Sequence, residues 1–88
     1  MSTNRHMMMT VNQAVAARIK ELLKKNGITR YRLAMKSGVP HSTLHNIMNN
    51  KDIDDHWFSN VILIASGFDM TLSEFCDTPL FGLENLNI

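Results

Sequence analysis

Signals that begin and end helices recur along the whole chain and divide it into five short helical patterns. Thr10 and Gln13 have the spacing of a capping box, in which each side chain satisfies a backbone amide of the other residue. Gly27 and Gly38 follow two of the patterns and can take the left-handed conformation with which helices often end. Between these signals the apolar residues recur with helical periodicity, and no segment has a convincing strand pattern. The chain is therefore predicted to be all-α.

The predicted helices are 11–25, 30–37, 40–48, a fourth that Asp54 or Asp55 caps and that continues through Ala65, and 72–77. Thr29 is expected to cap the second helix, and Asn49 and Asn50 are expected to form the loop after the third. The fourth helix is apolar on most sides, so we expect it to lie in the centre of the core.

The length of 88 residues, 44% of them apolar, allows one compact domain with one core. Three segments are predicted within it: a flexible N-terminal arm (1–9), a helical domain (10–78) and an apolar C-terminal tail (79–88). No apolar run approaches the roughly 20 residues of a membrane span, and the first residues do not resemble a secretory signal. The single cysteine, Cys76, agrees with a reducing compartment. A cytoplasmic protein is expected, with no membrane partner.

The small net charge of +1 conceals a strong segregation of charge along the chain. Residues 1–51 contain all nine Lys and Arg residues and one acid, Glu21, for a net charge of +8. Residues 52–88 contain the other seven acids and no Lys or Arg, for a net charge of −7. Such asymmetry in a small domain indicates that one face meets a polyanion.

The segment 28–51 has the pattern of a helix-turn-helix, in which the second helix enters the major groove of DNA. It contains "T-x-x-x-L-A-x-x-S-G-V" and "S-T-L-x-x-I", and "GFDMTLSEF" follows at 67–75. Together these motifs resemble the phage-repressor-like (Xre- or Cro-type) helix-turn-helix family of bacterial and phage DNA-binding proteins, over roughly residues 11–77. The resemblance implies a compact five-helix, lambda-repressor-like domain in which helices two and three form the helix-turn-helix.

The same resemblance implies a role for individual residues. The residues expected to contact base edges are His41, Ser42 and Asn46, followed by Thr43 and His45. Those expected to contact phosphates are Thr29, Arg30, Asn49, Asn50 and Lys51, with Arg32 and Lys36 as additions that could equally be solvated surface residues. The chemistry agrees, because an Asn amide can pair with adenine N6 and N7, whereas ammonium and amide donors on phosphates fix register without reading sequence.

The function implied is sequence-specific binding to double-stranded DNA by a small transcriptional regulator, a repressor, that acts as a homodimer at least on a palindromic operator. The tail supplies the candidate dimer contacts, Phe81, Leu83, Leu86 and Ile88. An alternative is that the tail folds back over the fifth helix and completes the core.

A second class of function is a protein-interaction module, such as an antitoxin-like partner or an adaptor, with weak, non-specific DNA binding. Such a module would use the acidic half of the chain and the apolar tail. The acidic and aromatic segment "KDIDDHWFSN" is unusual near DNA, because Asp52, Asp54 and Asp55 would repel phosphate if they faced it, so either this loop turns away from DNA or the affinity is modest. Trp57 and Phe58 are expected mainly in the core, with an exposed partner-binding edge as the alternative.

Catalysis and metal binding have little support. His41 and His45 lie four residues apart on one helix, but a structural zinc site needs about four ligands, and the remaining candidates have no metal-motif spacing. Cys76 lies in a semi-buried position typical of an inert thiol. No enzyme activity, metal or cofactor is expected.

Overall fold

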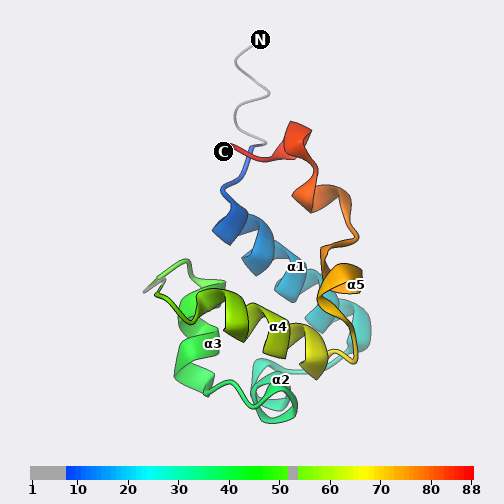
Figure 1. Cartoon of the computed structure of the whole chain (residues 1–88). Helices are drawn as coiled ribbons and strands as arrows, with labels where there is room; N and C mark the ends of the chain where they lie inside the picture. Colours follow the sequence, from blue (N-terminus) through cyan, green and yellow to red (C-terminus); the bar gives the residue numbers. More distant parts are fainter. Residues whose placement is uncertain (1–7, 52–53) are drawn as a thin grey trace.

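The computed structural model describes residues 8–51 and 54–88, which form five α-helices and two short 3-10 helices (Figure 1). The elements are α1 (Val11–Asn26), α2 (Arg30–Ser37), α3 (His41–Met48), α4 (Trp57–Gly67), α5 (Leu72–Cys76), η2 (Pro79–Phe81) and η3 (Leu83–Asn85). Apart from one parallel bridge between Met9 and Leu86, these residues form no β-structure. The prediction of an all-α domain is confirmed, although residues 1–7 of the expected arm lie outside the described residues.

Local hydrogen bonds explain where three of the helices begin. At α1, the Thr10 hydroxyl accepts from the Gln13 amide (3.1 Å), and the Gln13 side chain accepts from the Thr10 amide (2.9 Å). Thr71 and Glu74 form the same capping box at α5, and the Thr29 hydroxyl accepts from the Arg32 amide at α2. Each cap satisfies amides that have no partner within the helix, so these boundaries are fixed by residues three apart in sequence.

The start of α4 differs from the prediction. His56 occupies the N-cap position and makes no side-chain capping bond. Asp54 acts one turn earlier, where its carboxylate accepts from the His56 amide (2.9 Å) and its carbonyl accepts from the Trp57 amide (3.1 Å). The carboxylate is used in a turn, so α4 begins later than the acidic residues indicated.

The core lies between α1, α2, α3 and α4 and is closed by α5. Its largest fully buried side chains are Phe75, Ile19, Leu33, Leu44, Met48, Ile64 and Val39. The inner side of α4 contributes Val61, Ile64 and Ala65, but Phe58, Ile62 and Leu63 on the same helix are 56%, 43% and 44% exposed. The expectation that α4 lies in the centre of the core was wrong, because the other helices cover only one of its faces.

The close approach of α2 and α4 depends on Gly67, at the end of α4. A β-carbon there would lie 2.9 Å from Leu33 Cδ1 and 2.9 Å from Ser37 Cβ, closer than van der Waals contact allows. The fourth helix was expected to end at Ala65, but it continues through Gly67, and Asp69 beyond it takes the left-handed conformation (φ 59°). The absence of a side chain at Gly67 therefore matters for packing, since protein interiors tolerate little added volume.

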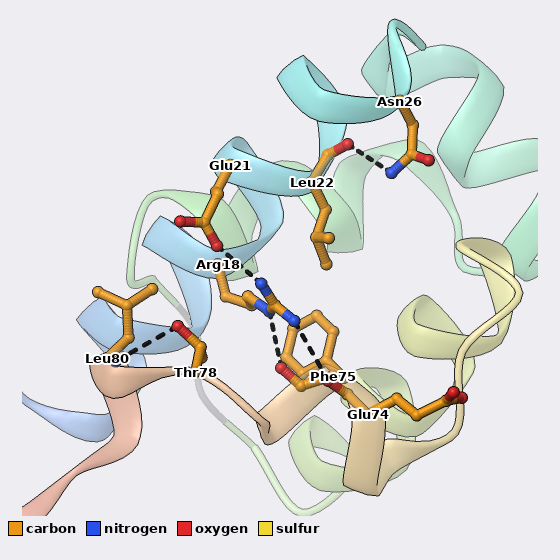
Figure 2. A network of polar contacts seen from close by, with 8 residues as sticks. All are labelled: Arg18, Glu21, Leu22, Asn26, Glu74, Phe75, Thr78 and Leu80. Carbon is orange, nitrogen blue, oxygen red and sulfur yellow. Dashed lines mark hydrogen bonds and ion pairs between the residues drawn. The ribbon is translucent and has the colours of Figure 1, made fainter.

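Arg18 ties α1 to the C-terminal end of α5 (Figure 2). Its Nε donates to the Phe75 carbonyl (2.7 Å), its Nη2 donates to the Glu74 carbonyl (3.2 Å), and its Nη1 pairs with the Glu21 carboxylate (2.8 Å). The guanidinium carbon also lies 5.9 Å from the centre of the Phe75 ring. The arginine therefore adds a donor to two carbonyls at the end of a five-residue helix, one of which, that of Glu74, also accepts from the Asp77 amide.

Replacing Arg18 by alanine is expected to lower the free energy of unfolding by about 1.5–3 kcal/mol, because hydrogen bonds from a charged donor to two carbonyls, one of them partly buried, are lost. Lys20→Ala, at an exposed position on the same helix, is the matched control and should change stability by about 0.5 kcal/mol or less. Urea denaturation followed by circular dichroism measures both. Equal losses in the two variants would show that the Arg18 contacts contribute nothing beyond surface charge.

The tail packs on the domain and pairs with the segment before α1. Phe81 lies 6.3 Å, centroid to centroid, from the core residue Phe75, and Leu86 is 7% exposed. The Met9 amide donates to the Asn85 carbonyl (2.9 Å), and the Met9 carbonyl accepts from the Asn87 amide (2.7 Å). In Figure 1 this pairing lies at one end of the molecule, and α2 and α3 lie at the opposite end.

Candidate nucleic-acid interface

Helices α2 and α3 form a helix-turn-helix whose inner side is fixed by the core. Gly38 makes the turn in the left-handed conformation (φ 76°), and Val39 after it is buried. The Ser37 hydroxyl donates to the Ala34 carbonyl and accepts from the Val39 amide, so the buried turn has satisfied polar groups. Leu44 and Ile47 are 0% and 4% exposed and hold α3 from beneath.

The outer side of α3 presents uncharged polar groups to solvent. His41, Ser42 and His45 are exposed, whereas Thr43 and Asn46 are half-buried on the flank of the helix that faces α4. All five predicted base-contact residues are thus on α3, but they divide into an exposed stripe and a partly covered flank. The helical repeat predicted the stripe, and the covering of the flank depends on α4, which the local sequence does not reveal.

Asn49 and His45 are linked at the end of α3. The Asn49 side-chain amide donates to the His45 carbonyl (2.7 Å) and lies 3.4 Å from His45 Nδ1. The next residue, Asn50, takes the left-handed conformation (φ 58°), as its residue type predicted. This geometry turns the chain sharply away from α3, and the Lys51 amide returns to the Asn46 carbonyl (2.8 Å).

The predicted phosphate-contact residues surround α3 at both ends of the helix-turn-helix. Arg30, Arg32 and Lys51 are exposed, and no described acid lies within ion-pair distance of them. Lys36 differs, because its ammonium lies 3.5 Å from the Asp69 carboxylate, a partner far away in sequence. The Thr29 hydroxyl accepts one hydrogen bond as the cap of α2, so one of its two acceptor lone pairs is already occupied.

The acidic segment before α4 has a mixed position. Asp54 and Asp55 are exposed, with Asp54 engaged in the turn described above, while Asp52 and Ile53 lie outside the described residues. Trp57 is half-buried and packs against the core, as expected, but Phe58 is mostly exposed, contrary to the core assignment. The alternative of an exposed aromatic edge therefore applies to Phe58.

The four tail residues considered for dimer contact have different exposures. Leu86 is buried and Phe81 is half-buried against Phe75, both within the monomer. Leu83 and Ile88 are 77% and 86% exposed. The monomer uses part of the apolar tail to extend its own core and leaves the other part at the surface.

Residues 8–51 and 54–88 contain no cluster of three or more His, Cys, Asp or Glu side chains that could hold a metal ion. Cys76 is an exposed residue, yet partial burial of its thiol raises the pKa, and the nearby Arg18 guanidinium lowers it by a smaller amount. The thiol is therefore the neutral form at pH 7. No helix in these residues has the length and apolar character to span a membrane.

The comparison with known families covers the same segment. A family model described as Helix-turn-helix matches residues 19–56, from the middle of α1 to the residue before α4. No curated protein and no solved structure is significantly similar to the chain. The matched segment includes both helices of the motif, the turn and the loop after α3. Residues 19–56 are thus similar to the helix-turn-helix family of the phage-repressor (Xre) type, a family of DNA-binding regulators.

Proposed function

We propose that the chain is a sequence-specific regulator of transcription, a repressor, that binds double-stranded DNA in the cytoplasm with α3 in the major groove. The observation that carries the proposal is the composition of the exposed side of α3: uncharged hydrogen-bonding groups occupy it, and cations that pair with no acid among residues 8–51 and 54–88 lie at both ends of the motif. Uncharged hydrogen-bonding groups read base edges, and cations bind phosphates.

Dimeric binding is part of the proposal. An isolated α3 of eight residues reads few base pairs, and two protomers related by a two-fold axis would read both halves of a palindromic site. Leu83 and Ile88 are the exposed apolar tail residues available for contact between protomers. The segments 1–9, 10–78 and 79–88 are then an arm, a DNA-binding domain and a tail that both closes the core and contributes to the dimer.

Selection of bound duplexes from a random DNA pool tests the proposal, with wild type and the variants Asn46→Ala and Lys51→Ala. Asn46→Ala is expected to cost about 1–3 kcal/mol on the selected site and to relax the preference at one base pair. Lys51→Ala should weaken binding to all sequences by a similar factor, because it removes a phosphate contact. Equal losses on selected and random DNA in both variants would contradict the assigned roles.

The second candidate is a protein-interaction module, favoured by the exposed apolar side chains of α4, Phe58, Ile62 and Leu63. The same selection distinguishes it. Enrichment of a paired half-site motif supports the regulator, whereas binding that only fades with salt, without enrichment, supports a protein partner.

A further inference from the structure

A groove of about 380 Å³ lies between the first half of α1 and the loop that follows α3. Its polar lining comes from Gln13 and Lys20 on α1 and from Asn50 in the loop. Apolar side chains complete the lining: Met8, Met9, Ala16 and Ala17. Asn50 is one of the residues expected to contact phosphate, so the groove joins α1 to one end of the proposed DNA interface.

The polar side chains of the groove offer hydrogen-bond donors. The Gln13 oxygen accepts from the Thr10 amide (2.9 Å), which leaves the two hydrogens of its Nε2 for another partner. Within residues 8–51 and 54–88, no group accepts a hydrogen bond from that nitrogen, from Lys20 Nζ or from the Asn50 side-chain amide. Three such donors around one space suit an anion that has several acceptor oxygens.

The charge of the groove also favours an anion. No acidic side chain lines it. Glu21, the one acid of α1, pairs with Arg18 (2.8 Å) and borders a different depression, beside the tail. The ammonium of Lys20 is exposed and has no acidic partner among the described residues, so its charge is available to a ligand.

These features together suit a sugar–phosphate segment. Phosphate oxygens accept from ammonium and amide donors, and apolar side chains can lie against the deoxyribose. We propose that this groove binds the DNA backbone beside the phosphates that Asn50 and Lys51 are expected to contact, with Gln13 and Lys20 as further phosphate contacts. The inference rests on the proposed function, because DNA is the ligand.

The variant Lys20→Ala, which is expected to leave stability unchanged, removes the cation from the groove. A dimer then loses two phosphate contacts, so the slope of log affinity against log salt should become shallower by roughly 2. This contribution is additional to that of Arg30, Arg32 and Lys51. Affinity for selected and random duplexes should fall by a similar factor, because both have the same backbone. Fluorescence anisotropy of labelled duplexes measures both quantities.

The variant Gln13→Glu reverses the chemistry of the groove without removing the cap. Glu serves as well as Gln at the third position of a capping box, so the Thr10 amide keeps its acceptor. The amide donor is replaced by a negative charge that faces phosphate. We expect an affinity lower by roughly tenfold on selected and random DNA, with an unchanged urea midpoint.

Lys25→Ala is the matched control, because Lys25 is an exposed lysine of the same helix that does not border the groove. It should change the slope less than Lys20→Ala does. Ethylation interference on the selected duplex locates the contact directly. One phosphate is expected whose ethylation weakens wild-type binding but has little effect on Lys20→Ala, since that variant no longer contacts it.

The outcomes separate this inference from the proposed function. If Asn46→Ala relaxes one base pair but Lys20→Ala and Gln13→Glu leave the affinity and the slope unchanged, the groove does not bind the backbone and the DNA-reading role stands. If the selection yields no motif but both groove variants weaken binding as expected, the groove binds the backbone and sequence-specific reading is wrong.

A free anion is the other possible source of the same chemistry. Titration of the wild-type protein with inorganic phosphate, followed by the side-chain amide resonances of Gln13 and Asn50, tests for it. Saturable shifts of these resonances, together with groove variants that bind DNA like wild type, would assign the groove to a free anion and overturn the proposal.

Discussion

Raising the monovalent salt concentration from 50 to 200 mM is expected to weaken binding to the selected DNA site by roughly a thousandfold. Among the predicted phosphate-contact residues, each protomer presents three exposed cations without a described acidic partner, Arg30, Arg32 and Lys51. The proposed dimer would then neutralise about six phosphates, which gives a slope of roughly −5 in a plot of log affinity against log salt. The affinity falls because each neutralised phosphate releases a counterion, and that release is less favourable at high salt.

Fluorescence anisotropy of a labelled duplex at four or five salt concentrations measures this slope. Lys51→Ala removes one phosphate contact from each protomer, so it should reduce the slope by roughly 2. Lys36→Ala is the matched control and should reduce it less, because Asp69 already lies beside that ammonium. A wild-type slope shallower than roughly −2 would mean that these cations do not lie along the DNA backbone.

Replacing Phe75 by alanine is expected to lower the free energy of unfolding by about 3–5 kcal/mol. Its ring is completely buried, contacts the Arg18 guanidinium and the Phe81 ring, and joins α5 and the tail to the rest of the core. The neighbouring helices can collapse only partly into the space that the ring leaves. Since native domains are stable by about 5–15 kcal/mol, the variant should lose between a fifth and all of that stability.

Phe58→Ala is the control for this prediction, because the same residue type is 56% exposed there, and a loss of less than about 1 kcal/mol is expected. Urea denaturation of each variant gives the midpoint of unfolding and the slope of the free energy of unfolding against urea concentration. Similar losses in the two variants would show that the ring of Phe75 is not the link between the tail and the core.

The starts of α1, α2 and α5 and the ends of α1 and α2 were predictable because their causes are local, whereas those of α4 were not. Thr10, Thr29 and Thr71 each accept a hydrogen bond from an amide three residues later, and Gly27 and Gly38 have the positive φ that their residue type allows. The Arg18 network was not predictable, since its carbonyl partners are 56 and 57 residues away. Nothing near Arg18 in the sequence distinguishes it from a solvated lysine on the same helix.

The candidate site was likewise predictable only where its features depend on the local sequence. Helical periodicity identified the face of α3 that carries His41, Ser42 and His45. It did not show that α4 covers the flank bearing Thr43 and Asn46, or that Asp69 pairs with Lys36, because both depend on how distant segments pack. The exposed apolar side of α4 was missed for a related reason: its residues are as apolar as those in the core, and only the packing distinguishes them.

The pairing of Met9 with Asn85 and Asn87 has a practical meaning for protein engineering. Because the two ends of the described chain meet, a short linker could join them, and the chain could be reopened in an exposed loop as a circular permutant. Both ends also lie across the molecule from α2 and α3 (Figure 1). A fluorescent protein or an effector domain fused after Ile88 would therefore extend away from DNA bound as proposed and leave α3 unobstructed.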